Sequence, residues 1–207
     1  MKKLFFASVA MALAAPLAVP TAFAQAADPA AGTVQALDNG LLSIMRSGAG
    51  AGQAGRARAI APVIDRTFDI PLMTRLAVGP AWTGISAGDQ AGLVVAFRAL
   101  TVAQYARNFD SFGGESFVMS PQVETRGGDK LVRTTLSVPK GSPEALNYRL
   151  RQSGGSWKII DVYFRNSISQ LATRRSEFAR PLATGGARAL IAHLNQLAAR
   201  PAAGDVR

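Results

Sequence analysis

The chain has 207 residues, of which 48% are hydrophobic and 17% are charged, and it contains no Cys. A disordered chain would be poorer in apolar residues, and disulfide scaffolds and Cys-based zinc sites need thiols, so these classes are excluded. The 23 Lys and Arg residues outnumber the 13 Asp and Glu residues, and the formal net charge is +10. The basic residues are scattered and do not alternate with aromatic residues, so the charge does not indicate nucleic-acid binding. It fits either a solvated basic surface or attraction to anionic lipid surfaces.

The first 24 residues are typical of a secretory signal peptide. Lys2 and Lys3 form a positive start, residues 4–19 are apolar or small, and residues 22–24 read Ala-Phe-Ala, a small-residue cleavage site. An uncleaved membrane anchor is the alternative, and the short apolar run disfavours it. We therefore expect cleavage after Ala24 and export from the cytoplasm. Residues 25–207 then form a single domain, which is long enough to bury a sizeable core.

The first half of this domain is predicted to be helical. Apolar residues recur at helical spacing over residues 32–46, and a second helix begins near Arg56. Asp69 is expected to cap a short helix with Pro71 in its first turn. Ser86, followed by Asp89, resembles a capping box at the start of a long helix that ends near residue 109.

After residues 113–114 the apolar period changes from 3.6 to two, which predicts strands. Four alternating runs follow, with Gly-containing turns at 127–129 and 153–155, and the last run, 157–164, is apolar on both faces and is therefore expected at the centre of the sheet. Two helices, at 167–179 and 187–199, close the chain. The predicted fold class is α+β, with a four-stranded antiparallel sheet covered by N- and C-terminal helices.

Groups suited to catalysis are few. The single His, His193, lies between apolar residues of the last helix, where a structural role is expected, and one His cannot supply a multi-His metal site. Asp161 and Tyr163 are two apart on the last strand and share one face, so this pair is the candidate for proton transfer on an apolar substrate. The other interpretation is a sheet-edge Asp beside a core Tyr. We expect no catalytic site, no metal and no cofactor, and keep the enzyme as an alternative.

A set of large apolar residues is expected to point toward the inside of the domain. Composition alone does not distinguish a filled core from a cavity. If a cavity exists, these residues are the predicted lining: Met73, Leu76, Val78, Trp82, Phe97, Leu100, Tyr105, Phe117, Met119, Leu136, Val138, Tyr148, Leu150 and Val162.

The order of short motifs resembles the MlaC (toluene-tolerance Ttg2D) family of periplasmic lipid-binding proteins. Each motif alone is weak, but together they cover about residues 34–196 in the right order. They are residues 69–75 (DIPLMTR), 79–82 (GPAW), 97–100 (FRAL) with Tyr105, 132–134 (VRT), 147–150 (NYRL), 155–162 (GSWKIIDV) and 174–178 (RRSEF). Residues 168–178, followed by Gly185 and Gly186, look most like the hopanoid-associated HpnM subgroup.

The resemblance implies an NTF2-like fold whose helices and curved sheet enclose lipid tails in an apolar cavity, without enzymatic activity. It implies a hopanoid or phospholipid cargo carried between an inner-membrane transporter complex, of the RND type or the MCE/ABC type, and an outer-membrane acceptor. An envelope scaffold with a filled core is a further alternative. The chain departs from the family pattern at Thr83, Asn147 and Asn166, so the resemblance does not determine which kind of lipid headgroup lies at the mouth.

The short element from Asp69 to Trp82 is the candidate gate of such a cavity. It is bounded by Asp69 and by Gly79 and Pro80, so it is expected to shift as a unit, and Arg75 on it is the candidate for contact with an anionic headgroup. The alternative is that this element only packs the core and that Arg75 pairs with a nearby carboxylate.

Overall fold

The structure is a computed structural model, and it describes residues 28–139 and 141–201. The predicted signal peptide, residues 1–24, lies outside the described residues. No helix among the described residues has both the length and the apolar character needed to cross a bilayer.

The first half of the domain is helical, as predicted. Its elements are α1 (Pro29–Ser47), η1 (Ala49–Ala51), α2 (Gly52–Thr67), α3 (Ile70–Val78), η2 (Gly79–Gly84) and α4 (Ala87–Asn108). The predicted caps are present: the Asp69 carboxylate accepts a hydrogen bond from the Leu72 N–H, and the Ser86 hydroxyl accepts one from the Asp89 N–H. These side chains satisfy amide groups that a helix start leaves without partners. The segment around residue 50 forms the short helix η1.

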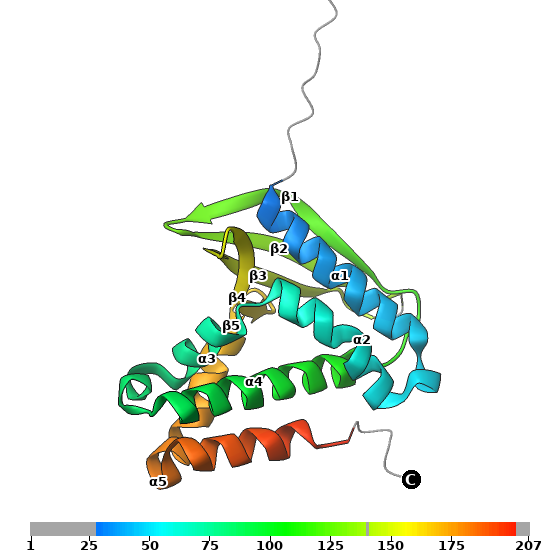
Figure 1. The fold of residues 1–207 in the computed structure, drawn as a ribbon. Coiled ribbons are helices and arrows are strands. Elements are labelled where there is room, and N and C mark those ends of the chain that lie inside the picture. The colour runs from blue at the N-terminus through cyan, green and yellow to red at the C-terminus, as the bar shows by residue number, and fades with distance from the viewer. Residues whose placement is uncertain (1–27, 140, 202–207) are drawn as a thin grey trace, which may run out of the picture.

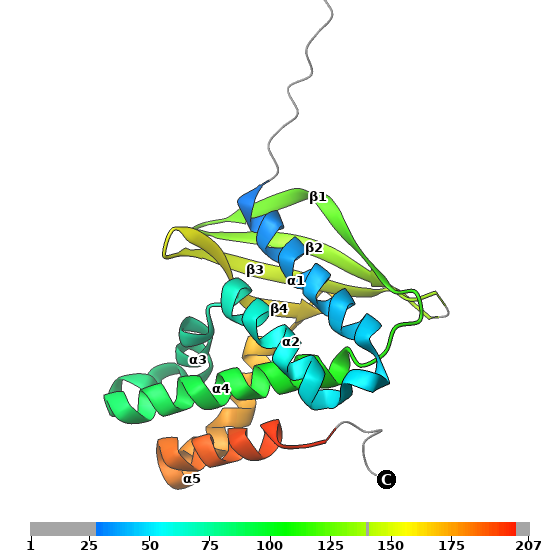
Figure 2. The ribbon, with the colours of Figure 1, turned by 45° about the vertical axis from the view of Figure 1, so that its right-hand side comes forward.

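The second half is an antiparallel sheet with strands in sequence order. The strands are β1 (Ser116–Arg126), β2 (Asp129–Ser137), β3 (Glu144–Ser153), β4 (Ser156–Phe164) and β5 (Ile168–Ser169). Figures 1 and 2 show the sheet at one end of the molecule, with α1 across it and the other helices stacked on the same side. The α+β prediction is therefore confirmed.

Two details of the predicted sheet are wrong. It has five strands rather than four, because Arg165 and Asn166 adopt positive φ angles of 51° and 67° and turn the chain so that β5 pairs with the end of β4. Two residues are too few to give a periodic signal. β4 is also not central, since its second neighbour is only the two-residue β5. Helices α1, α2, α3 and α5 all contact β4, and Ile159, Ile160 and Val162 on this strand are buried.

The last helix, α5 (Gln170–Ala198), is one element with a kink where the sequence predicted two helices. Gly185 and Gly186 have non-helical dihedral angles, and the helical segment before them is longer than expected. The first half of α5 passes from the sheet across α4, and after the kink the second half runs along α4 as the outermost layer (Figures 1 and 2).

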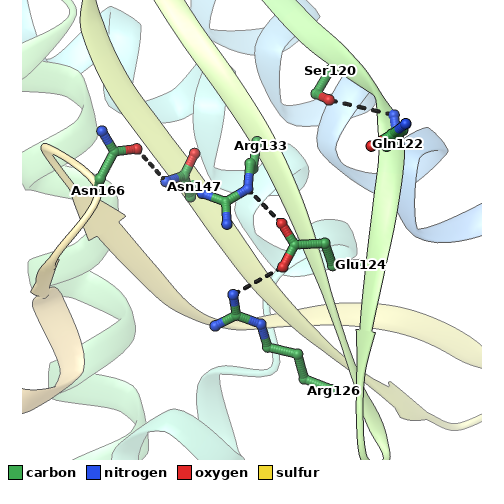
Figure 3. A network of polar contacts seen from close by, with 7 residues as sticks. All are labelled: Ser120, Gln122, Glu124, Arg126, Arg133, Asn147 and Asn166. Carbon is green, nitrogen blue, oxygen red and sulfur yellow. Dashed lines mark hydrogen bonds and ion pairs between the residues drawn. The ribbon is translucent and has the colours of Figure 1, made fainter.

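The outward face of the sheet is polar. Glu124 on β1 accepts hydrogen bonds from Arg126 and from Arg133 on β2, and Asn147 on β3 donates to the side-chain oxygen of Asn166 at 2.9 Å (Figure 3). The last bond ties the middle of the sheet to the turn that precedes β5. Alternation along the strands thus separates an outer polar face from an inner apolar face.

We expect the kink to depend on Gly186. Its φ of 63° and ψ of −157° lie in a region that is almost restricted to Gly, so Gly186→Ala should lower the free energy of unfolding by about 1–3 kcal/mol. Urea denaturation measures this change. Gly32→Ala is the matched control, because Gly32 lies in α1 with open space around a new Cβ atom, and there Ala should stabilise the protein. Equal stability of the two variants would contradict this account of the kink.

Candidate functional site

A cavity of about 390 Å³ lies between the inner face of the sheet and the helices α4 and α5. This volume is within the range of about 300–1,000 Å³ that is usual for small-molecule sites. Its wall is mainly aromatic and aliphatic and carries a few polar groups. The lining residues are Phe68, Met73, Phe97, Thr101, Gln104, Tyr105, Asn108, Phe109, Leu136, Glu144, Leu146, Tyr148, Val162, Phe164, Gln170, Leu171 and Arg174.

Aromatic rings form one wall of the cavity. Tyr105 meets the edge of Phe68 with ring centroids 5.6 Å apart and stacks on Phe109 at 5.8 Å. Phe109 in turn lies against Phe117, at 6.4 Å. Such contacts hold large rings in fixed positions, so the wall keeps its shape while it presents apolar surface to the space inside.

Besides Thr101 and the two Tyr residues, the polar residues of the lining belong to the end of α4, the start of β3 and the start of α5, and we assign the mouth of the cavity to these segments. They are Gln104, Asn108, Glu144, Gln170 and Arg174. Asn108 is exposed to solvent, which places the opening on this side. The Arg174 side chain is only 13% exposed and pairs with Glu177 on the next turn of α5. The arrangement combines an apolar chamber with a wet, charged entrance.

One acid is buried without a hydrogen-bond partner for one of its oxygen atoms. Asp38 on α1 is 1% exposed, and its Oδ1 atom has no hydrogen-bond partner among the described residues. Burial raises the pKa of Asp38 to about 7, because the low-polarity surroundings disfavour the charged carboxylate. Asp38 is not among the residues that line the cavity. Burial also raises the pKa of the wall residues Tyr105 and Tyr148, and the Asp38 charge contributes to both shifts.

The structure brings six of the predicted lining residues to the cavity: Met73, Phe97, Tyr105, Leu136, Tyr148 and Val162. The other eight lie elsewhere. Leu100, Val78 and Leu150 are buried in the filled part of the core, and Leu76, Trp82, Phe117, Met119 and Val138 are half-buried away from the cavity. Leu150 shares a face with Tyr148, but it lies opposite Ile159 on β4, where side chains fill the space.

The candidate headgroup residue, Arg75, is not at the cavity. It is exposed on α3 and forms no ion pair within the described residues. Only Met73 of the candidate gate reaches the cavity, and α3 is held at both ends. The Asp69 N–H donates to the Ile159 carbonyl on β4 at 2.9 Å, and the Arg175 guanidinium donates to the Leu76 carbonyl at 2.7 Å.

Several lining residues were missing from the prediction, although sequence periodicity could have identified some of them. Phe164 follows from the alternation that contains Val162, and Phe109 lies one helical turn after Tyr105. The placement of Arg174 could not be derived from periodicity, since it depends on how α5 docks against α4 and β3.

The pair proposed for proton transfer does not face the cavity. Asp161 is 4% exposed, and its carboxylate accepts hydrogen bonds from the Ser169 hydroxyl and from the Leu171 and Val162 N–H groups. It therefore holds the start of α5 against β4. Tyr163 is half-buried and is not among the lining residues. The geometry gives Asp161 a structural role, and neither residue of the pair is among the lining residues.

Comparison with known proteins places the chain in a family. A sequence model described as MlaC protein matches residues 35–196, which is more than half of the chain. The chain belongs to the MlaC family. A solved structure of a phospholipid-binding protein from Ralstonia solanacearum, in complex with a phospholipid, has the same fold as this MlaC-family chain, with a TM-score of 0.70. The two are 21% identical, and the match covers 83% of this chain and 98% of that one. No curated protein sequence matches.

The buried acid of this MlaC-family protein predicts an unusual pH dependence of stability. The pKa of Asp38 is about 7 in the folded protein against 3.8 in the reference state, so the folded state keeps a proton that the unfolded state has lost. Between about pH 4 and pH 7 the folded state therefore binds more protons, and the free energy of unfolding falls as pH rises. Each pKa unit corresponds to about 1.4 kcal/mol, so the expected loss is a few kcal/mol.

Chemical denaturation between about pH 5 and pH 8 measures this slope, and Asp38→Asn should flatten it. Three other acids titrate below this window, because the pKa values of Asp28, Asp65 and Asp129 are lowered. Hydrogen bonds from Arg side chains lower the pKa values of Asp65 and Asp129. For Asp28, burial raises the pKa, but the hydrogen bond from Lys130 and the other interactions lower it overall. The same slope in wild type and variant would show that Asp38 is not the group responsible.

Proposed function

We propose that this protein is a periplasmic lipid-binding carrier that shields lipid tails in its cavity and shuttles lipid between the inner and outer membranes. The observation that carries the proposal is the cavity itself, which has an aromatic and aliphatic chamber and a charged mouth. Membership of the MlaC family and the shared fold with the R. solanacearum phospholipid-binding protein support the same conclusion.

The energetics of lipid transfer explain why such a chamber is useful. Exposing one methylene group to water costs about 0.8 kcal/mol, so an acyl chain of about 16 carbons costs about 13 kcal/mol. A carrier has to remove this cost while it crosses an aqueous compartment, and it has to release the chain at a membrane. A preformed apolar wall with one opening meets both needs, and no catalytic group is required.

The headgroup is proposed to lie at the mouth, close to Arg174. Its guanidinium lies at the cavity lining and is mostly buried, and its partner Glu177 is itself partly exposed. A planar guanidinium matches phosphate oxygens in geometry as well as charge. An anionic phospholipid can therefore replace Glu177 as the partner of Arg174.

The location and the partners are proposed from the resemblance and from the predicted signal peptide. We propose an inner-membrane transporter complex and an outer-membrane acceptor as the proteins that exchange lipid with this carrier. A phospholipid or a hopanoid is the proposed cargo, and the NTF2-like classification and the HpnM subgroup stay predictions.

The direct test is to purify the protein from its native host, extract it with organic solvent and identify the lipid by mass spectrometry. Stoichiometric phospholipid or hopanoid is the expected result. A protein that is free of lipid and takes up none from vesicles would contradict the proposal and favour an envelope scaffold.

A charge on the chamber wall should abolish lipid binding. Leu136 lines the cavity, so Leu136→Glu places a carboxylate where the tails are proposed to lie, and an unpaired buried charge is strongly unfavourable. We expect lipid content to fall by more than about tenfold with an unchanged circular dichroism spectrum. Thr135→Glu is the matched control, since Thr135 is the neighbouring residue on the outer face of β2 and should keep full lipid content. Full lipid content in a folded Leu136→Glu variant would show that Leu136 does not contact the lipid tails.

The two candidate headgroup residues can be compared directly. A hydrogen bond to a charged group contributes about 1.5–3 kcal/mol, so Arg174→Ala should weaken binding of phosphatidylglycerol by roughly tenfold to a hundredfold. Arg75→Ala removes an exposed guanidinium outside the cavity and should leave the dissociation constant unchanged. Binding by vesicle co-flotation measures both variants. If Arg75→Ala weakened binding and Arg174→Ala did not, the headgroup would have to lie near α3 instead.

A further inference from the structure

Large apolar side chains are exposed to solvent beside the mouth of the cavity. Among the described residues, the exposed large apolar side chains are those of Val95, Phe112, Val118 and Ile168. Phe112 follows the end of α4 and Ile168 precedes the start of α5, so both belong to the segments around the mouth. A single exposed apolar residue is common on protein surfaces, but two at one opening call for a shared explanation.

Ile168 extends the apolar wall of the cavity to the outside. It lies directly opposite Phe164 in the antiparallel pair of β4 and β5, and opposed residues of such a pair point to the same face of the sheet. Phe164 lines the cavity, as do Gln170 and Leu171, which follow Ile168 closely in the chain. Ile168 itself is 47% exposed. The apolar surface therefore continues from the chamber out to solvent.

Phe112 lies near the same opening. It comes three residues after Phe109 and four after Asn108, and both of these line the cavity. Three residues of chain span at most about 11 Å, so Phe112 cannot be far from the mouth. Its ring is 42% exposed, although most other aromatic rings of this region are packed against one another.

An Arg side chain accompanies each of these apolar sites. The Arg46 guanidinium lies over the Phe112 ring, 5.0 Å from its centroid. The Arg165 guanidinium lies over the Phe164 ring at the same distance, and its side chain is 65% exposed although it pairs with Glu144. Apolar side chains flanked by Arg are typical of protein surfaces that lie in the interface of an anionic membrane.

A mouth that touches the bilayer also solves a physical problem of lipid uptake. A lipid that leaves a bilayer exposes its tail to water unless the cavity opens directly against the membrane. Apolar residues around the opening can enter the boundary between headgroups and acyl chains, while the guanidinium groups stay at the level of the phosphates. The tail then passes from one apolar environment to another.

We propose that Phe112 and Ile168, with Arg46 and Arg165, form a lip that docks directly on a bilayer containing anionic phospholipid. This inference rests on the proposed lipid-binding function, and it identifies the membrane surface itself as a partner of the mouth. Asp110 lies in the same segment as Phe112 and is exposed, which weakens the electrostatic attraction. The apolar contacts therefore contribute the larger part of docking, and the two Arg residues add a preference for anionic lipid.

The test measures uptake of a phospholipid with a fluorescent acyl chain from protein-free vesicles of phosphatidylcholine and phosphatidylglycerol. Phe112→Ser and Ile168→Ser should each slow uptake several-fold, and the double variant should slow it by roughly tenfold or more, because less apolar area enters the interface. Co-flotation with the same vesicles should weaken in parallel, and vesicles of phosphatidylcholine alone should bind the wild type less tightly. The affinity for a monomeric fluorescent fatty acid in solution should not change, since neither residue lines the cavity.

Val95→Ser is the matched control. Val95 is 68% exposed on α4, but it lies about 20 Å along that helix from Asn108 at the mouth, so its variant should take up lipid at the wild-type rate. Wild-type rates in the double variant would overturn the lip. So would a wild-type protein that binds the fatty acid but takes no lipid from protein-free vesicles, because the mouth would then receive lipid from another protein. Failure to bind the fatty acid would overturn the proposed function as well.

Discussion

The inner face of β3 has to be covered along its whole length, and the helices cover its two ends in different ways. At the Leu150 end, side chains from the helices and from β4 fill the space, and Leu150 and Ile159 are completely buried. At the Leu146 end, the rings of Tyr105 and Phe109 stack on one another, and a cavity is left between them and the sheet. The same strand thus contributes to a stabilising core and to a chamber.

The rigid wall explains how the chamber stays open without a ligand. Close packing normally collapses an apolar void, because atoms that line it lose contacts. Here the rings on α4 are held by each other and by Phe68, and the Phe97 ring meets Phe178 of α5 edge to face at 5.9 Å. The open chamber therefore depends on ring contacts within its own wall and on the contact of Phe97 with Phe178 behind that wall.

Sequence periodicity predicted those parts of the structure that depend on local chemistry. The caps at Asp69 and Ser86 are confirmed because a capping side chain acts within three residues of its own position. Long strands and helices were recognised because their apolar faces repeat. The two-residue β5 and the off-centre position of β4 were not recognised, since strand pairing and helix coverage are set by the tertiary arrangement.

The placement of polar side chains also depends on the tertiary arrangement, which sequence periodicity does not predict. Arg75 was favoured because it shares a short element with apolar residues, but it faces solvent, while Arg174 reaches the mouth only because α5 starts directly after β5. Asp38 lies on α1, and its burial to 1% exposure depends on the elements that pack against that helix.

The distribution of polar groups also gives the chamber a direction. Glu144 and Arg174 carry the charges of the lining, and most of the remaining wall is aromatic or aliphatic. A ligand with one charged head and an apolar tail therefore fits in one orientation, with the head beside Arg174 and the tail against the aromatic wall. The Asp38 carboxyl acts separately, because it is not among the lining residues, and its burial lowers the stability of the folded protein as the pH rises toward 7. A ligand bound in the chamber stabilises the folded state, so the loaded protein tolerates this cost better than the empty one.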